Sequence, residues 1–193
     1  MQPVIRKATP EDAALILRVI DMASDGFVPA LLREMAPDGM DGSEFGLALV
    51  RAEEGEFSYR HGWVCVQGGL PLGGMIGYPL PTTPEPAELD VPDALLALKE
   101  LENLVPGYWY INFVALSPDS RGQGLGTALL DEAESQAHEC GCPGLALVVV
   151  ASNVGAIHAY ERAGYLEKAR RPFRLADFGL ESTEALLMVK ELA

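Results

Sequence analysis

The feature that most constrains the fold is a glycine-rich turn between a β-prone segment and an amphipathic helix. Residues 108–116 are rich in aromatic and β-branched side chains, which predicts a strand. The turn follows at residues 121–126 (RGQGLG), and apolar side chains then recur at helical spacing over residues 125–137. A helix that opens this way presents unpaired backbone N–H groups at its N-terminus. The turn therefore predicts an anion site that suits a pyrophosphate.

The segments around this turn predict a mixed α/β order. The apolar run at 145–150 is typical of a strand buried on both faces, and the helix after it is capped by Ser152 or Asn153 and ends at Gly164. The order strand–helix–strand–helix–strand over 108–169 predicts a parallel pair with right-handed crossovers. The other expected strands are 4–8, 63–66, 72–78, 165–169 and 185–189, and the other expected helices begin at Thr9-Pro10 and cover 25–36 and 44–53.

Residues 79–107 interrupt this order with prolines, six acids and a helix expected at 93–104. The segment is too short to hold a core of its own, so we expect one domain over residues 1–193 with a loop-like insertion. Its acids stand against the single base Lys99, which predicts attraction for a positively charged ligand. The acids are Glu85, Glu88, Asp90, Asp93, Glu100 and Glu102.

Composition excludes several function classes. The chain has 28 acids and 14 bases, a net charge of −14, which repels phosphate backbones and argues against a nucleic-acid partner. The longest apolar run, residues 145–151, is too short to span a membrane, and the N-terminus has no apolar signal segment, so we expect a cytoplasmic protein. Cys65, Cys140 and Cys142 fit neither a disulfide framework nor zinc-ligand spacing, which predicts reduced thiols and no metal.

Two common phosphate-binding motifs do not fit the turn. The dinucleotide fingerprint needs a glycine where Thr127 stands, and the P-loop needs a lysine that the turn lacks. The pattern instead resembles the GNAT superfamily of N-acetyltransferases, whose first signature matches residues 116–118 (LSP) followed by 121–126 (RGQGLG). A second signature matches in the right order and spacing, as Asn153, Ala156, Tyr160 and Gly164-Tyr165.

This resemblance implies an α/β acyl-CoA N-acyltransferase fold with a mixed central sheet flanked by helices and splayed near 114–116. It implies an acyltransferase that moves an acetyl group from acetyl-CoA to a primary amine of a small molecule or peptide. Tyr160 would protonate the leaving thiolate. The turn would hold the CoA pyrophosphate, the preceding strand would pair with the pantetheine arm, and Asn153 would touch it. The expected cofactor-binding residues are Val114, Ala115, Leu116, Arg121, Gly122, Gln123, Gly124, Leu125, Gly126, Thr127 and Asn153.

The general base is left open. An amine with a pKa of about 10.4 is almost fully protonated at pH 7, so a base must accept its proton. Ribosomal-type protein N-terminal acetyltransferases carry a Glu five residues before the Asn, and here that position is Val148. The alternatives are Glu100, Glu102, Asn112 through a water, or His61, whereas His138 and His158 are expected to be surface or core residues.

Three further expectations follow. Because Val148 cannot accept a proton, a second reading is a non-catalytic acetyl-CoA-binding module that acts as a sensor or partner subunit. Because the insertion leads into the strand where the acceptor meets the thioester in this family, the acceptor is expected to be cationic. A homodimer is a further expected assembly.

Overall fold

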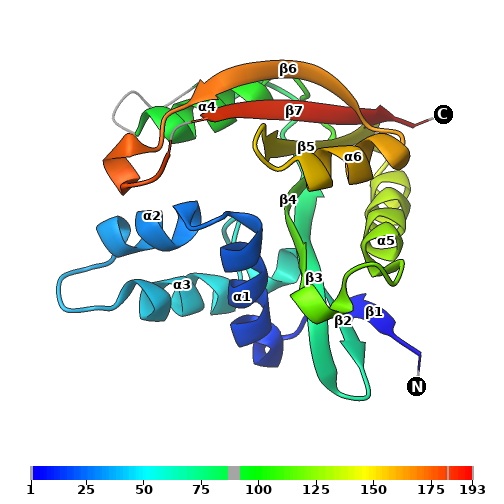
Figure 1. Cartoon of the computed structure of the whole chain (residues 1–193), viewed down its shortest axis with the longest axis horizontal. Coiled ribbons are helices and arrows are strands. Elements are labelled where there is room, and N and C mark those ends of the chain that lie inside the picture. Colours follow the sequence, from blue (N-terminus) through cyan, green and yellow to red (C-terminus); the bar gives the residue numbers. More distant parts are fainter. Residues whose placement is uncertain (1, 87–91, 182, 193) are drawn as a thin grey trace. The chain divides into compact units, whose positions relative to one another are not determined.

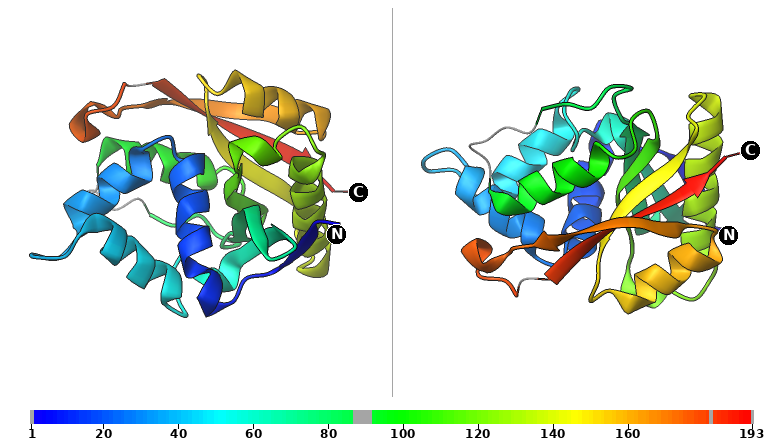
Figure 2. Two further views of the ribbon diagram at one scale, coloured as in Figure 1. Left: turned by 60° about the horizontal axis from the view of Figure 1, so that its bottom comes forward. Right: turned by 90° about the horizontal axis from the view of Figure 1, so that it is seen from above.

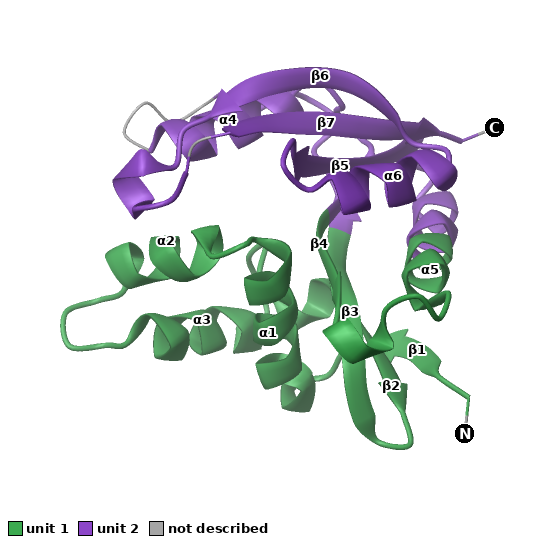
Figure 3. Cartoon of the chain, viewed as in Figure 1, with its two compact units in different colours: residues 1–77, 112–132 green, residues 78–111, 133–193 purple. Residues whose placement is uncertain are grey.

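The structure, a computed structural model, describes residues 2–86, 92–181 and 183–192 (Figure 1). Within these residues, seven strands hydrogen-bond in the order β1-β2-β3-β4-β5-β7-β6, which makes the sheet mixed. The chain divides into two compact units (Figure 3). Unit 1 holds residues 1–77 and 112–132, and unit 2 holds 78–111 and 133–193. Three elements contribute residues to both units: β3 (Leu70–Pro79), β4 (Trp109–Leu116) and α5 (Leu125–Glu139).

The sheet of unit 1 is built on a glycine hairpin. Strand β2 (Gly62–Gln67) turns into β3 through Gly68 and Gly69, whose φ values of 60° and 82° suit the tight turn that matches strand twist. Strand β1 (Val4–Lys7) pairs antiparallel with β2, so that Lys7 lies opposite Trp63. The expected hairpin is therefore confirmed.

Three helices complete the described part of unit 1: α1 (Ala13–Ala23), α2 (Phe27–Met35) and α3 (Gly42–Arg51). A 3₁₀ turn at Pro10–Asp12 begins the first of them, and the Thr9 N–H donates to the Asp12 carboxylate over 2.8 Å. The helices pack on one another, and side chains at helical spacing, such as Ile16 and Ile20, are fully buried. This spacing confirms the helix expected from Thr9-Pro10.

Unit 2 gathers the carboxyl-terminal strands. The start of β4 pairs in parallel with β5 (Gly144–Val150), joining Trp109–Ile111 to Leu145–Leu147. Strand β7 (Thr183–Glu191) lies antiparallel between β5 and the edge strand β6 (Leu166–Phe173). The parallel pairing expected from the sequence is therefore confirmed.

Two helices have all their residues in unit 2. Helix α4 (Asp93–Glu102) lies against β6, as Figure 2 also shows, and buries Ala94, Ala97 and Leu101. Helix α6 (Val154–Arg162) follows β5 and ends before Gly164, whose φ is 92°. Among the described residues, no helix is long and apolar enough to cross a membrane.

Candidate functional site

The glycine-rich turn of unit 1 has a backbone that side chains would not allow. Gly122 and Gly124 have φ values of 71° and 79°, in the left-handed region that favours glycine. A Cβ built on either residue meets no atom within 4 Å, so the space beside this backbone is open. Glycine is therefore favoured at these two positions by the positive φ values and not by a lack of space for a side chain. The open space leaves room for a ligand to approach the backbone.

The turn is also suited to an anion by its dipoles and charge. The first helical hydrogen bond of α5 runs from the Ala128 N–H to the Gly124 carbonyl over 3.1 Å, so the N–H groups before Ala128 have no partner inside the helix. Arg121 is exposed beside them, and its Nε donates to the Leu116 carbonyl over 3.4 Å. Thr127 is exposed on the first turn of α5. A helix N-terminus and a guanidinium together favour a phosphate group.

Polar contacts hold this turn in shape. The Ser117 N–H donates to the Leu72 carbonyl over 2.8 Å, and the hydroxyls of Ser117 and Ser120 lie 2.8 Å apart. The Gln123 side-chain amide donates to the Asp119 carbonyl over 3.0 Å, and the Leu125 side chain is buried at the start of α5. These anchors fix the turn before any ligand arrives, which lowers the entropy cost of binding.

The end of β4 reaches the same turn within unit 1. Val114, Ala115 and Leu116 are half-buried, in contrast to the buried Trp109–Ile111. Gly73 of β3 lies against them, and a Cβ on Gly73 would stand 2.2 Å from the Ala115 carbonyl oxygen. Sequence reasoning missed this glycine, although a Gly-Gly pair inside a strand signals close backbone approach. The expected splay near 114–116 concerns both units and stays a prediction.

Asn153 and Tyr160 belong to unit 2. Asn153 caps α6, because its Oδ1 accepts from the Ala156 N–H over 3.2 Å. Its side chain therefore orders the start of the helix that carries Tyr160, and any contact with pantetheine stays a prediction. Burial raises the pKa of Tyr160 to about 12, so its phenol is protonated at neutral pH and serves as a donor.

Tyr165 packs beside Tyr160 and was part of the motif without an assigned role. Their ring centroids lie 5.9 Å apart with the planes tilted by 57°. The Tyr165 N–H donates to the Tyr160 carbonyl over 3.0 Å, which fixes the two residues across the Gly164 turn. Tyr165 is 1% exposed, and burial raises the pKa of its phenol.

The candidate bases differ in their surroundings. Glu100 accepts from Arg171 over 2.7 Å, and Glu102 lies 3.9 Å from Lys99, so both carboxylates face cations. Burial, with a smaller effect of Lys7, lowers the pKa of His61, which leaves its imidazole neutral at pH 7 and able to accept a proton. Asn112 is half-buried on β4. His138 and His158 are exposed on their helices, as expected.

Val148, which stands where ribosomal-type enzymes carry a Glu, lies on β5. Its backbone lies opposite Leu187 in the β5–β7 pairing, and the side chain offers no proton acceptor. Cys65, Cys140 and Cys142 form no disulfide in the described structure, and burial raises the pKa of Cys65 and Cys142. No group of metal-binding side chains is found in the described ranges.

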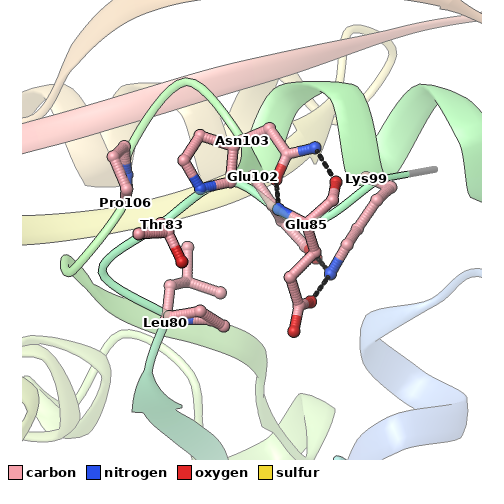
Figure 4. A pocket seen from close by; sticks show the side chains of 9 residues that line it. Leu80, Thr83, Glu85, Lys99, Glu102, Asn103 and Pro106 are labelled. Atoms are coloured by element: carbon pink, nitrogen blue, oxygen red, sulfur yellow. Dashed lines mark hydrogen bonds and ion pairs between the residues drawn. The ribbon is translucent and has the colours of Figure 1, made fainter.

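The described acids of the insertion pair with its own Lys99 and with two arginines from elsewhere in unit 2. Figure 4 shows Lys99 directed at Glu85, while the Asn103 side chain binds the Glu85 backbone over 3.0 and 2.8 Å. Arg171 pairs with Glu100, and Arg174 lies 3.4 Å from Asp93. Glu88 and Asp90 lie outside the described residues. The hollow beside these side chains has a volume of about 10 Å³, room for a single water, so it is no substrate pocket.

The sequence and structure were compared with those of known proteins. None of the curated proteins compared with the chain matches it. The chain is similar in fold to Ard1 from Thermoplasma volcanium (19% identity, 100% and 99% of the two chains, TM-score 0.64). It is also similar to the ribosomal-protein-S18-alanine N-acetyltransferase from Escherichia coli (20% identity, 100% and 95%, TM-score 0.58). A third similar fold is Naa20 of Chaetomium thermophilum, solved with a bisubstrate analogue (21% identity, 98% and 86%, TM-score 0.62).

Residues 29–165, more than half of the sequence, match the acetyltransferase (GNAT) family. The mixed sheet flanked by helices agrees with that assignment, as do the two signatures at 116–126 and 153–165. The chain therefore belongs to the acetyltransferase (GNAT) family and is an acyltransferase.

Proposed function

We propose that this protein transfers an acetyl group from acetyl-CoA to a primary amine of a small molecule or a peptide. The observation that carries the proposal is the turn at the start of α5, with open space beside Gly122 and Gly124 and with N–H groups ahead of Ala128 that have no partner inside the helix. A similar fold has been solved with CoA and a peptide, as the NatC complex bound to Gag peptide and CoA (14% identity, TM-score 0.61).

The residues of the turn fit the diphosphate of CoA. The N–H groups of residues 122–127 would hold the phosphate oxygens, and Arg121 would balance their charge. The half-buried backbone of Val114, Ala115 and Leu116 would pair with the pantetheine arm as an added strand would. A backbone N–H in that stretch would stabilise the oxyanion that forms on the carbonyl.

Bound acetyl-CoA supplies the thioester, whose C–S bond breaks as the amine nitrogen bonds to the carbonyl carbon. Tyr160 would give its phenolic proton to the leaving sulfur. Its pKa of about 12 keeps this proton in place until a thiolate forms nearby. Among the candidate bases, His61 has a lowered pKa, so its imidazole is neutral at pH 7.

The acceptor is proposed only as a primary amine. The expectation of a cationic acceptor depended on an acidic insertion, and the described acids of that segment each lie within 4.0 Å of Lys99, Arg171 or Arg174. Acids that are already paired with cations attract a further cation less than the sequence alone suggests.

The test is an amine panel assayed for CoA thiol release, together with calorimetry of acetyl-CoA binding. We expect turnover on at least one primary amine, and we expect Tyr160→Phe to lower kcat by about 10²–10⁴-fold with acetyl-CoA affinity unchanged. Binding without turnover on any amine would favour the acetyl-CoA-binding module instead. Wild-type kcat in Tyr160→Phe would remove the tyrosine from the mechanism.

A further inference from the structure

The Tyr165 phenol is a buried polar group that the described structure leaves without a partner. Its side chain is 1% exposed, and in the part of the chain that the structure describes its hydroxyl makes no hydrogen bond. A buried hydroxyl without a partner destabilises a fold, and phenylalanine would fill the same space without that cost. Packing alone therefore accounts for the ring of Tyr165 but not for its oxygen.

Two groups of unit 2 are placed near the Tyr165 phenol. The ring of Tyr160, on α6, has its centroid 5.9 Å from the centroid of the Tyr165 ring. Glu134 of α5 acts on the phenol electrostatically, and its carboxylate lies 2.6 Å from the Lys190 ammonium of β7. The negative charges of Tyr160 and Glu134 both disfavour ionisation of Tyr165, so these groups lie within electrostatic reach of it. The Glu134 carboxylate is already paired with the Lys190 ammonium. Tyr160 is the neighbour whose charge changes in the proposed reaction, since it gives up its proton.

We infer that Tyr165 is a positioning residue that donates a hydrogen bond to the Tyr160 oxygen once Tyr160 has given up its proton. This inference rests on the proposed role of Tyr160. The Tyr160 O–H bond breaks as its proton bonds to the leaving sulfur, and the resulting phenolate accepts from the Tyr165 O–H. Tyr165 keeps its own proton. Tyr160 regains a proton from water, and the proton that the amine nitrogen loses to the base returns to the solvent in its place, so the cycle balances.

Two physical points support this order of events. A phenolate at Tyr160 is costly in a buried setting unless a donor faces it, because burial disfavours the charged form. Hydrogen bonds to charged groups are stronger than those between neutral groups, so the same contact stabilises the phenolate more than the phenol. A donor that is unsatisfied before reaction and satisfied during it lowers the barrier selectively.

The test compares Tyr165→Phe with Tyr108→Phe, each of which removes one phenolic oxygen. The Tyr108 hydroxyl is hydrogen-bonded to Glu191 over 2.8 Å, so its removal breaks an existing bond. We expect Tyr165→Phe to keep or raise Tm, to keep KM for acetyl-CoA, and to lower kcat by about 10- to 100-fold. We expect Tyr108→Phe to show the opposite pattern, with a lower Tm and an unchanged kcat.

A double variant separates this inference from the proposed function. If Tyr165 acts through Tyr160, then Tyr165→Phe causes no further loss in a Tyr160→Phe background. Wild-type kcat in Tyr165→Phe, or losses that multiply in the double variant, would overturn the inference while leaving the role of Tyr160 intact. Wild-type kcat in Tyr160→Phe would overturn both.

Discussion

Replacing Gly73 with alanine inserts a methyl group between β3 and β4 where the proposed cofactor strand ends. The added Cβ would lie 2.2 Å from the Ala115 carbonyl oxygen and 2.8 Å from the Leu116 Cα, whereas ordinary contact begins at 3.4 Å. The two strands must therefore separate by roughly 1 Å, which is enough to break a neighbouring backbone hydrogen bond. The bond at risk runs from the Ser117 N–H to the Leu72 carbonyl over 2.8 Å.

The cost has two parts that a matched variant separates. Gly73 has a φ of 151°, and alanine there carries a backbone strain of about 1–3 kcal/mol in addition to about 1–3 kcal/mol for the overlap. Gly69 also has a positive φ, 82°, but a Cβ there meets nothing within 4 Å. Gly69→Ala therefore carries strain without overlap.

The assay is thermal unfolding of both variants, followed by calorimetry with acetyl-CoA. In a chain of this size each kcal/mol shifts Tm by about 2–4 °C, so Gly73→Ala should melt about 2–12 °C below Gly69→Ala. Acetyl-CoA should also bind Gly73→Ala more weakly, because Ala115 and Leu116 are displaced. Equal Tm values for the two variants would refute the reasoning, since they would mean that β3 and β4 do not approach so closely.

Three other outcomes are expected. Gly124→Asp should abolish CoA binding by calorimetry and Gly124→Asn should weaken it less, because both face open space and only Asp adds a charge that repels phosphates; equal binding in the two would contradict this assignment. The hydrogen bond and ion pair with Arg6 lower the pKa of Asp12, so Asp12→Asn should lower the free energy of unfolding at pH values above about 4. This difference between wild type and variant should vanish as pH falls through the lowered pKa. A difference of the same size in denaturant titrations at pH 7 and at pH 2 would contradict this. Arg171→Ala frees Glu100 and should raise the kcat/KM ratio of cationic over neutral amines by about 2- to 5-fold at low salt, whereas Arg170→Ala, which frees Glu167 and Glu184, should leave the ratio unchanged.

Local signals predicted most elements of the fold. The Gly68-Gly69 hairpin, the helix start at Thr9-Pro10 and the helix end at Gly164 all agree with the structure, because each is set by residues a few positions apart. The edge strand β6 was expected to end at residue 169 and continues to Phe173. The charged residues and Pro172 in this extension do not predict a strand from the sequence. An edge strand tolerates both, so the strand continues through them.

Long-range pairing is what the sequence concealed. The insertion of β7 between β5 and β6 joins segments far apart in the chain, and no local pattern specifies it. The contact of Gly73 with Ala115 is similar, because the strand pattern shows a glycine but not the strand it meets. The sequence alone suggests the part of the proposed site that lies in one short motif, at residues 121–126, but not the part to which a second strand contributes Gly73.

The acid-rich insertion shows why charge counted along the chain differs from charge in space. Within residues 79–107 the six acids face one lysine, which predicts a strongly negative surface. In the fold, Arg171 pairs with Glu100 and Arg174 with Asp93, although each arginine lies more than 70 positions along the chain from its partner. Exposed pairs of this kind contribute little to stability, but they weaken the field of the acids that they pair. We therefore expect selectivity for an amine acceptor to depend on shape and on hydrogen bonds made to the nitrogen more than on attraction to these paired acids.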